Sequence, residues 1–212
     1  MPRAKVIPQS EYPYNISARS INRDWFQVPM DTVWKIFCEE LSNVNQKHKM
    51  EIHSFVLMSN HFHLIASTPE ANISKCMHYF MQRTSKRLTK AGNRINETFA
   101  GRHYKCILQH PNYFLNAYKY NYRNPVAAGL CSQVQDYTFS TLHGKLNPSK
   151  LLIPVCEDTT LKFDPAGTLA WLNIAPSMEK AEGFRFGLRH QYFQSKKDRI
   201  TNKPILSEND LL

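Results

Sequence analysis

Two apolar runs with only two residues between them constrain the fold of this chain more than any other feature. The runs extend over residues 52–58 and 61–66, and Ser59 and Asn60 separate them. Connections of two residues are typical of β-hairpins, and asparagine tolerates the left-handed backbone conformation that such a turn can need. We therefore expect two antiparallel strands joined by a tight turn.

The segments around this hairpin follow helical or strand periodicity in a regular order. Asp31 is expected to cap the first helix, because its carboxylate can accept from free backbone N–H groups. Pro125 is expected to end the third helix at Arg123, because proline disfavours helical geometry in the residue before it. Outside the hairpin, the expected elements are a strand at Tyr14–Arg19, a helix at Met30–Lys47, a helix at Ile73–Lys90, a strand at Tyr104–Leu108 and a helix at Asn112–Arg123.

This order of elements predicts an α+β fold that is ferredoxin-like, with a mostly antiparallel sheet and helices packed on one face of it. From about Gly144 onward prolines interrupt the pattern, and only a short helix near Met178–Tyr192 is expected. We therefore assign residues 1–143 to one domain and residues 144–212 to a C-terminal extension, partly helical and a candidate for DNA contact. The basic residues that could add affinity there are Arg185, Arg189, Lys196 and Lys197.

The charge balance favours a polyanionic partner. Lys and Arg number 27 against 17 Asp and Glu, which gives a formal net charge of +10. Such an excess steers anionic partners and releases counterions from phosphates, although a soluble protein with a basic surface has the same composition. The sequence has no glycine-rich phosphate loop and no serine nucleophile elbow, so ATP-driven chemistry and serine hydrolysis lose support and no nucleotide cofactor is expected.

Cysteine usage and apolar runs indicate the compartment. The five cysteines are scattered and form no C-x-x-C pair, so neither a disulfide framework nor a cysteine zinc site is indicated and a reducing environment fits best. The first residues carry charges and prolines without the apolar core of a signal peptide. No apolar run approaches the ~20 residues of a membrane helix, so we expect a cytoplasmic protein without membrane association.

The sharpest local motif is His61-Phe62-His63 in the second strand of the hairpin. Side chains alternate between the faces of a strand, so both imidazoles project to one side, ~6.6 Å apart along the strand. Two imidazoles at that spacing can share one divalent cation, while Phe62 points into the core. An H-x-H pattern is weak by itself, since two half-buried histidines bonded to backbone or water would look the same.

A second group of candidates is aromatic and belongs to the third helix. Tyr120 and Asn124 are four residues apart and share one helical face, so a phenol and an amide carbonyl could meet beside a metal. Four tyrosines in one helix are also typical of core packing with hydroxyls at a wet edge. Spacing alone does not choose the reactive tyrosine among Tyr113, Tyr118, Tyr120 and Tyr122.

Basic residues on the second helix and in the following loop could track a phosphate backbone. The alternative is a solvated helix face, which has the same pattern of charges. The candidate DNA contacts are Arg83, Lys86, Arg102 and Lys105, with Phe99 and Tyr104 nearby as aromatic rings on which bases could stack.

Four segments in a fixed order together resemble the REP-associated tyrosine transposases, a branch of the single-tyrosine transposases within the His-hydrophobic-His endonucleases. The resemblance covers roughly residues 12–143, and four ordered blocks are far more specific than any one motif. The blocks are SARSINR at residues 17–23, VLMSNHFHL at 56–64, FAGRHYK at 99–105 and YNYRNPVAAGL at 120–130.

The resemblance implies roles that spacing could not assign. The family nucleophile stands four residues before the asparagine of the Asn-Pro-Val block, which here makes it Tyr120. That asparagine, Asn124, is the implied third metal ligand beside His61 and His63. The implied cation is Mg²⁺ or Mn²⁺.

Two positions depart from the family pattern. Ser59 replaces a common proline, which should only make the turn less rigid. Ala127 replaces a common arginine, which could weaken a phosphate contact. The catalytic set is otherwise intact, which argues against an inactive homologue.

The implied activity is cleavage and joining of single-stranded DNA beside a hairpin, through a 5′-phosphotyrosine intermediate. The alternative is a non-catalytic protein, derived from a transposase, that binds hairpin DNA or RNA. Both a monomer and a homodimer are compatible with the sequence.

Overall fold

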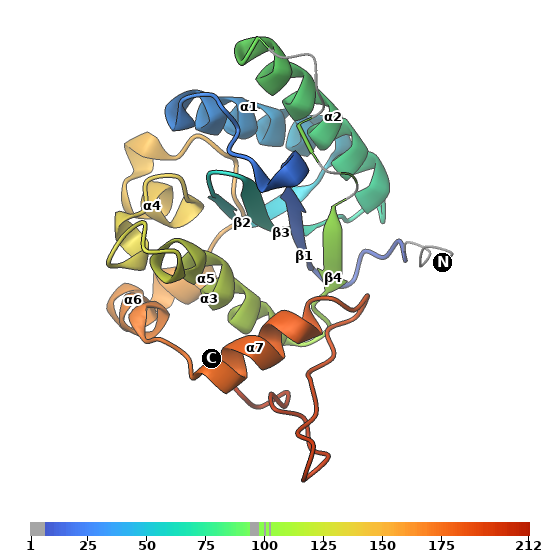
Figure 1. Cartoon of the computed structure of the whole chain (residues 1–212), viewed down its shortest axis with the longest axis vertical. Helices are drawn as coiled ribbons and strands as arrows, with labels where there is room; N and C mark the ends of the chain where they lie inside the picture. The colour runs from blue at the N-terminus through green and yellow to red at the C-terminus, as the bar shows by residue number, and fades with distance from the viewer. Residues whose placement is uncertain (1–6, 94–97, 100, 102) are drawn as a thin grey trace.

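The computed structural model describes residues 7–93, 98, 99, 101 and 103–212. Its centre is a four-stranded antiparallel sheet with the strand order β2-β3-β1-β4 (Figure 1). This order, with a helix after the first and third strands, is the ferredoxin-like arrangement, so the predicted α+β class is confirmed. The strands are β1 (Tyr14–Arg19), β2 (Glu51–Leu57), β3 (His61–Ser67) and β4 (Tyr104–Ile107).

One face of the sheet is covered by α1 (Met30–His48) and α2 (Ile73–Ala91). Phe62 and Leu64 of β3 point into this layer, where both are fully buried, and the Phe62 ring lies 5.7 Å from the ring of Phe37. The apolar stripes of the two helices are long enough to cover the sheet, which explains why the sequence predicted both helices and their N-terminal ends.

The opposite face is also covered, so the prediction of helices on one face only is wrong. Alternate strand residues are apolar there as well, and Val56, Ile65 and Cys106 pack against α3 (Pro111–Ala127). Figure 1 shows α1 and α2 on one side of the sheet and α3, α6 and α7 on the other. A strand with apolar residues on both faces needs a layer on each side.

Two local predictions about helix ends are corrected. The residue that precedes α1 is Pro29 and no side chain caps the helix, so Asp31 lies inside the first turn, where its charge favours the helix dipole. Helix α3 continues through Pro125 to Ala127, because the proline lies in the last turn and removes only one helical hydrogen bond. The N–H of Ala128 donates to Asn124 at 2.9 Å and completes that turn.

The C-terminal extension contains more helix than the sequence predicted. Short helices open at side-chain caps: Ser140 accepts from the His143 N–H, Asp158 from Leu161 and Asp164 from Gly167. The predicted helix near residue 178 ends at Gly187 and not at Tyr192. No helix in the described part of the chain is long and apolar enough to cross a lipid bilayer. The helices after α3 are α4 (Thr141–Leu146), α5 (Thr159–Phe163), α6 (Pro165–Asn173) and α7 (Met178–Gly187). Along the described part of the chain, 3₁₀ turns lie at Ile21–Arg23, Val134–Asp136 and Pro148–Lys150.

Candidate active site and nucleic-acid interface

The hairpin places both histidines on one face of the sheet. In β3, His61 pairs with Arg19 and His63 pairs with Ser17 across the antiparallel ladder. Directly opposed residues in such a ladder point to the same side, so these four side chains share the face that α3 covers. The centroids of the two imidazole rings are 5.0 Å apart.

The turn residue Asn60 sets the orientation of His61. The Asn60 side-chain carbonyl lies 2.7 Å from Nδ1 of His61, and the Asn60 amide donates to the backbone carbonyl of Arg23 at 2.7 Å. Because a carbonyl oxygen can only accept, Nδ1 of His61 carries the proton and Nε2 keeps its lone pair. This is the form of imidazole that binds a metal through Nε2.

His63 is buried, and neither of its ring nitrogens has a hydrogen-bond partner among the described residues. A buried polar atom without a partner is uncommon and needs an explanation, and a bound cation would supply one. Burial, His61 and Arg19 lower the pKa of His63 to about 3, while burial and Arg19 lower that of His61 to about 4. Both rings are therefore neutral near pH 7, as metal ligands must be.

Helix α3 brings Tyr120 and Asn124 to the same place. The ring centroids of Tyr120 and His63 are 5.9 Å apart at an interplanar angle of 86°. The Asn124 amide donates to the backbone carbonyl of Tyr120 at 2.8 Å, so its side-chain carbonyl oxygen is the atom that it can offer to a cation. The two imidazoles, Tyr120 and Asn124 all line one cavity of about 1000 Å³.

The other tyrosines of α3 are held in the core. The Tyr118 hydroxyl donates to the Asp158 carboxylate at 2.7 Å, and the Tyr122 hydroxyl lies 2.9 Å from the Thr141 hydroxyl. Tyr113 packs on Phe193 with ring centroids 4.4 Å apart. None of these three lines the cavity, so the geometry separates Tyr120 from its neighbours where spacing could not.

Residues 16–119 match the family described as IS200-like transposases. This match covers just under half of the chain. It confirms the resemblance found in the sequence, and the comparison with solved structures extends that resemblance to the fold.

The fold of this chain is similar to that of a REP-associated tyrosine transposase whose structure was solved bound to a REP hairpin. The TM-score is 0.59 at 20% sequence identity, over 74% of this chain and 93% of the other. A putative transposase from Deinococcus radiodurans matches 50% of this chain and 82% of its own, at 16% identity and a TM-score of 0.37. No curated protein matches the chain in sequence.

The cavity that contains Tyr120 is strongly basic. Besides the predicted Lys105, its wall contains arginines from two distant parts of the chain. Arg185 belongs to α7 and Arg189 follows its C-terminal end. The sequence had indicated only that these two residues could add affinity for DNA. Arg19 and Arg23 were missed, although the pairing of Arg19 with His61 follows from the strand alternation of both segments.

Two of the predicted DNA contacts lie away from this cavity, because α2 covers the opposite face of the sheet. The Arg83 Nε donates to the buried carboxylate of Glu40 at 2.6 Å, and Lys86 is exposed on the same helix. Arg102 lies outside the described residues, so its place is not defined.

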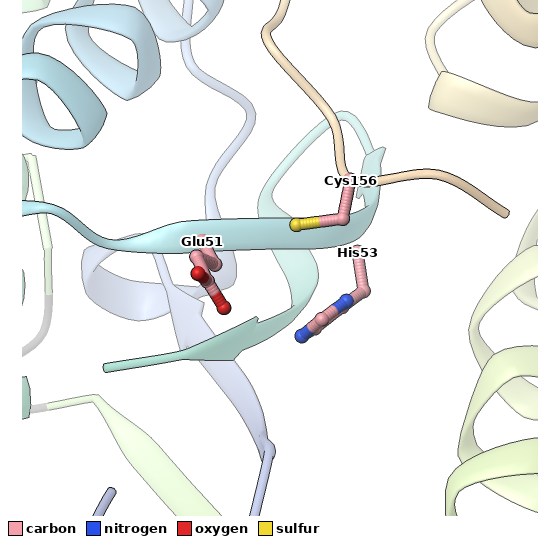
Figure 2. Close-up of side chains that lie close together, drawn as sticks. All are labelled: Glu51, His53 and Cys156. Carbon is pink, nitrogen blue, oxygen red and sulfur yellow. The ribbon is translucent and has the colours of Figure 1, made fainter. Parts of the chain in front are cut away.

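A second group of side chains that could hold a metal ion lies outside this cavity. Glu51, His53 and Cys156 approach one another at the start of β2 (Figure 2). Among the described residues it is the only group of three or more His, Cys, Asp or Glu side chains whose ligand atoms converge. The imidazole pair of the cavity differs in kind, since its third candidate donor is an amide.

Proposed function

We propose that this protein is a transposase that cuts and rejoins single-stranded DNA beside hairpins, with Tyr120 as the nucleophile that becomes covalently attached to the 5′ phosphate. The observation that carries the proposal is the 5.9 Å between the Tyr120 and His63 rings inside a basic cavity. The similarity in fold to a transposase solved with a REP hairpin supports the substrate class.

A divalent cation, Mg²⁺ or Mn²⁺, fits the donors that the chain presents. His61 and His63 would hold it through neutral nitrogens and Asn124 through its amide oxygen, and the orphaned nitrogens of His63 support this assignment. When bound, the cation would polarise the scissile phosphate and offset the negative charge that develops on it.

The chain's own residues would perform the transfer. The Tyr120 oxygen forms a bond to phosphorus as the bond from phosphorus to the 3′ oxygen breaks. The phenol proton is lost, and the departing 3′ oxygen takes up a proton to become a hydroxyl. The phosphotyrosine conserves the energy of the broken linkage, so a second 3′ hydroxyl can reverse the step and join strands without ATP.

Basic residues of the cavity would hold the backbone of the DNA in line with Tyr120. Arg19, Arg23 and Lys105 approach from the strand side, while Arg185 and Arg189 approach from α7. Arg83 and Lys86 are proposed contacts only for a longer path of the DNA, because they do not line the cavity. Arg102, which lies outside the described residues, also stays a proposed contact.

The decisive experiment uses a hairpin oligonucleotide with a single-stranded flank, labelled at its 3′ end because the protein stays on the 5′ phosphate of that fragment. Wild-type protein with Mn²⁺ should form a labelled adduct on a denaturing gel, and chelation by EDTA should abolish it. Tyr120→Phe should abolish the adduct while the dissociation constant stays within about twofold. Tyr104→Phe is the matched control, since Tyr104 lines the same cavity and is 71% exposed.

Three other outcomes would each contradict a different part of the proposal. An adduct formed by Tyr120→Phe and lost in Tyr104→Phe would move the nucleophile to β4. Binding of hairpin DNA without an adduct under any metal would favour the non-catalytic alternative. Preference for an RNA hairpin of the same sequence would exclude DNA as the substrate class.

A further inference from the structure

Three side chains of different chemistry converge beside the edge strand β2. Glu51 and His53 belong to β2, and Cys156 belongs to the segment that precedes α5. One ligand atom from each residue lies within 4.8 Å of the others, and Figure 2 shows the three side chains gathered at one place. None of the three lines the cavity that contains Tyr120.

The backbone fixes this convergence. The Cys156 N–H donates to the carbonyl of Ile52 at 2.8 Å, which holds the cysteine against β2 between its two partners. The register of β2 with β3 shifts between Ile52 and Ser54, at the position of His53. Such irregularities re-aim a side chain, and here they accompany a histidine that meets Glu51 from the same strand.

A hydrogen bond with Ser67 fixes the orientation of the His53 imidazole. Its Nε2 lies 2.7 Å from the Ser67 hydroxyl, so Nδ1 is the nitrogen that can face a cation. Histidine ligands of metals commonly use their second nitrogen in this way, bonded to a neighbour that fixes the ring. The neighbouring Lys145 does not compete for this position, because its ammonium is bonded to Asp158 at 2.7 Å and to the backbone carbonyl of His53.

We propose that Glu51, His53 and Cys156 form a binding site for Zn²⁺, separate from the catalytic cation. Thiolate, imidazole and carboxylate together are donors that Zn²⁺ prefers, whereas Mg²⁺ and Mn²⁺ bind thiolate poorly. Three protein ligands leave a fourth tetrahedral position for water. No local sequence signal marks this site, because Cys156 is about a hundred residues from Glu51 and His53.

The site would fasten the C-terminal extension to the sheet. Cys156 stands two residues before Asp158, whose carboxylate accepts from Tyr118 of α3 and caps α5. Zn²⁺ would therefore tie one loop to β2 on one side and to the helix that carries Tyr120 on the other.

Titration with Co²⁺, which replaces Zn²⁺ and absorbs in the near ultraviolet when bound to a thiolate, tests the site in the full-length reduced protein. Wild type should show the thiolate band with one Co²⁺ per chain, and Zn²⁺ should remove it. At about 100 times its dissociation constant, Zn²⁺ should raise the Tm by about 5–10 °C. Cys156→Ser should lose the band and show a smaller rise in Tm than wild type, because only the cavity can then bind the cation, while Cys131→Ser, which changes another half-buried free cysteine, should keep both effects.

Further variants separate this site from the catalytic one. His63→Ala should keep the thiolate band, because its ligands are elsewhere, and Glu51→Gln should weaken Zn²⁺ binding by at least about tenfold. Absence of the band in folded wild type, or its persistence in Cys156→Ser with an unchanged circular dichroism spectrum, would overturn the proposal.

Discussion

Arg83 and Glu40 illustrate how the surroundings of one side chain decide its role. The Glu40 side chain is fully buried, and it accepts from Arg83 at 2.6 Å and from Arg87 at 3.0 Å. Burial opposes the ionised form of Glu40, but hydrogen bonds from Arg83, Asn43 and Arg87 outweigh it and hold its pKa below the usual range. These contacts join α1 to α2, so Arg83 has a structural partner whether or not it also meets DNA.

A prediction about acid stability follows from this carboxylate. A group whose pKa is lowered by folding stabilises the protein above its unfolded pKa of ~4.3, and that contribution disappears as the pH falls through the folded pKa. Glu40→Gln should lower the free energy of unfolding by about 1.5–3 kcal/mol at pH 7. Urea unfolding between pH 5 and pH 3 should then show a smaller loss of stability in the variant than in wild type.

Glu39→Gln is the control for this experiment. Glu39 pairs with Arg87 on the same helices, but its side chain is 43% exposed, so its loss should change the stability by less than about 1 kcal/mol. Equal pH dependence in wild type and Glu40→Gln would show that the pair does not stabilise the fold.

At the scale of helices and strands, α7 contributes to the candidate active site from the far end of the chain. Phe184 packs against Tyr120 with ring centroids 5.5 Å apart, while Arg185 and Arg189 line the cavity. A helix of ten residues thus supports the proposed nucleophile with an apolar side chain and supplies charge beside it.

Removing one of these charges should weaken DNA binding in a salt-dependent way. Arg189→Gln should raise the dissociation constant for the hairpin oligonucleotide by about tenfold or more, the effect of one charge-assisted hydrogen bond. The slope of log affinity against log salt should fall by about 0.7, the value for one phosphate of a single strand. Fluorescence anisotropy at several salt concentrations measures both quantities.

Lys197→Gln is the matched control, since this residue is exposed and does not line the cavity. Its substitution should leave the salt slope close to that of wild type. If Arg189→Gln and Lys197→Gln weaken binding equally, the cavity has no special part in DNA contact.

The length of an element and the completeness of its apolar pattern decided whether the sequence predicted it. The hairpin, α1 and α2 were recoverable because each has a full apolar stripe or alternation. Helices α5 and α6 were not, because five and nine residues are too few for periodicity to show. The family resemblance selected Tyr120 as the nucleophile. The structure distinguishes Tyr120 from Tyr118 because the Tyr118 hydroxyl donates to Asp158, forty residues away. A contact over that sequence distance leaves no local signal in the sequence.

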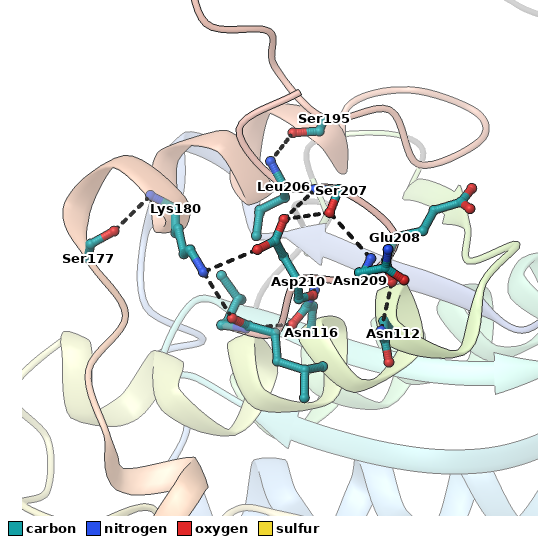
Figure 3. A network of polar contacts seen from close by, with 12 residues as sticks. Asn112, Asn116, Ser177, Lys180, Ser195, Leu206, Ser207, Glu208, Asn209 and Asp210 are labelled. Carbon is teal, nitrogen blue, oxygen red and sulfur yellow. Dashed lines mark hydrogen bonds and ion pairs between the residues drawn. The ribbon is translucent and has the colours of Figure 1, made fainter. Parts of the chain in front are cut away.

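Across the whole molecule, the C-terminal extension and α3 share one hydrophobic core. The last residues follow α3 through polar contacts as well (Figure 3): Asn116 donates to the backbone carbonyl of Asp210 at 2.9 Å, and the Leu212 N–H donates back to Asn116 at 2.8 Å. The buried residues that the extension contributes include Leu172, Phe184, Phe193, Leu206 and Leu212.

This shared core gives a test of the domain boundary proposed at residue 143. Those five apolar side chains each contribute about 1.5–3 kcal/mol by burial, and their sum is comparable with the ~5–15 kcal/mol that stabilise a typical domain. A chain of residues 1–143 alone should therefore lack cooperative thermal unfolding and should aggregate on gel filtration. A monomeric 1–143 fragment that melts cooperatively near the wild-type Tm would establish the boundary.

The alternation of His61, Phe62 and His63 also limits how this hairpin can change in length. If one extra residue in the turn shifted the pairing of β3 by one position, the two faces of the strand would be exchanged: both imidazoles would face α1 and α2, and Phe62 would face the cavity. Such a shift would remove the proposed metal ligands and the core contact in a single event. Between residues 57 and 63, therefore, the chain should accept changes of residue far more readily than changes of length.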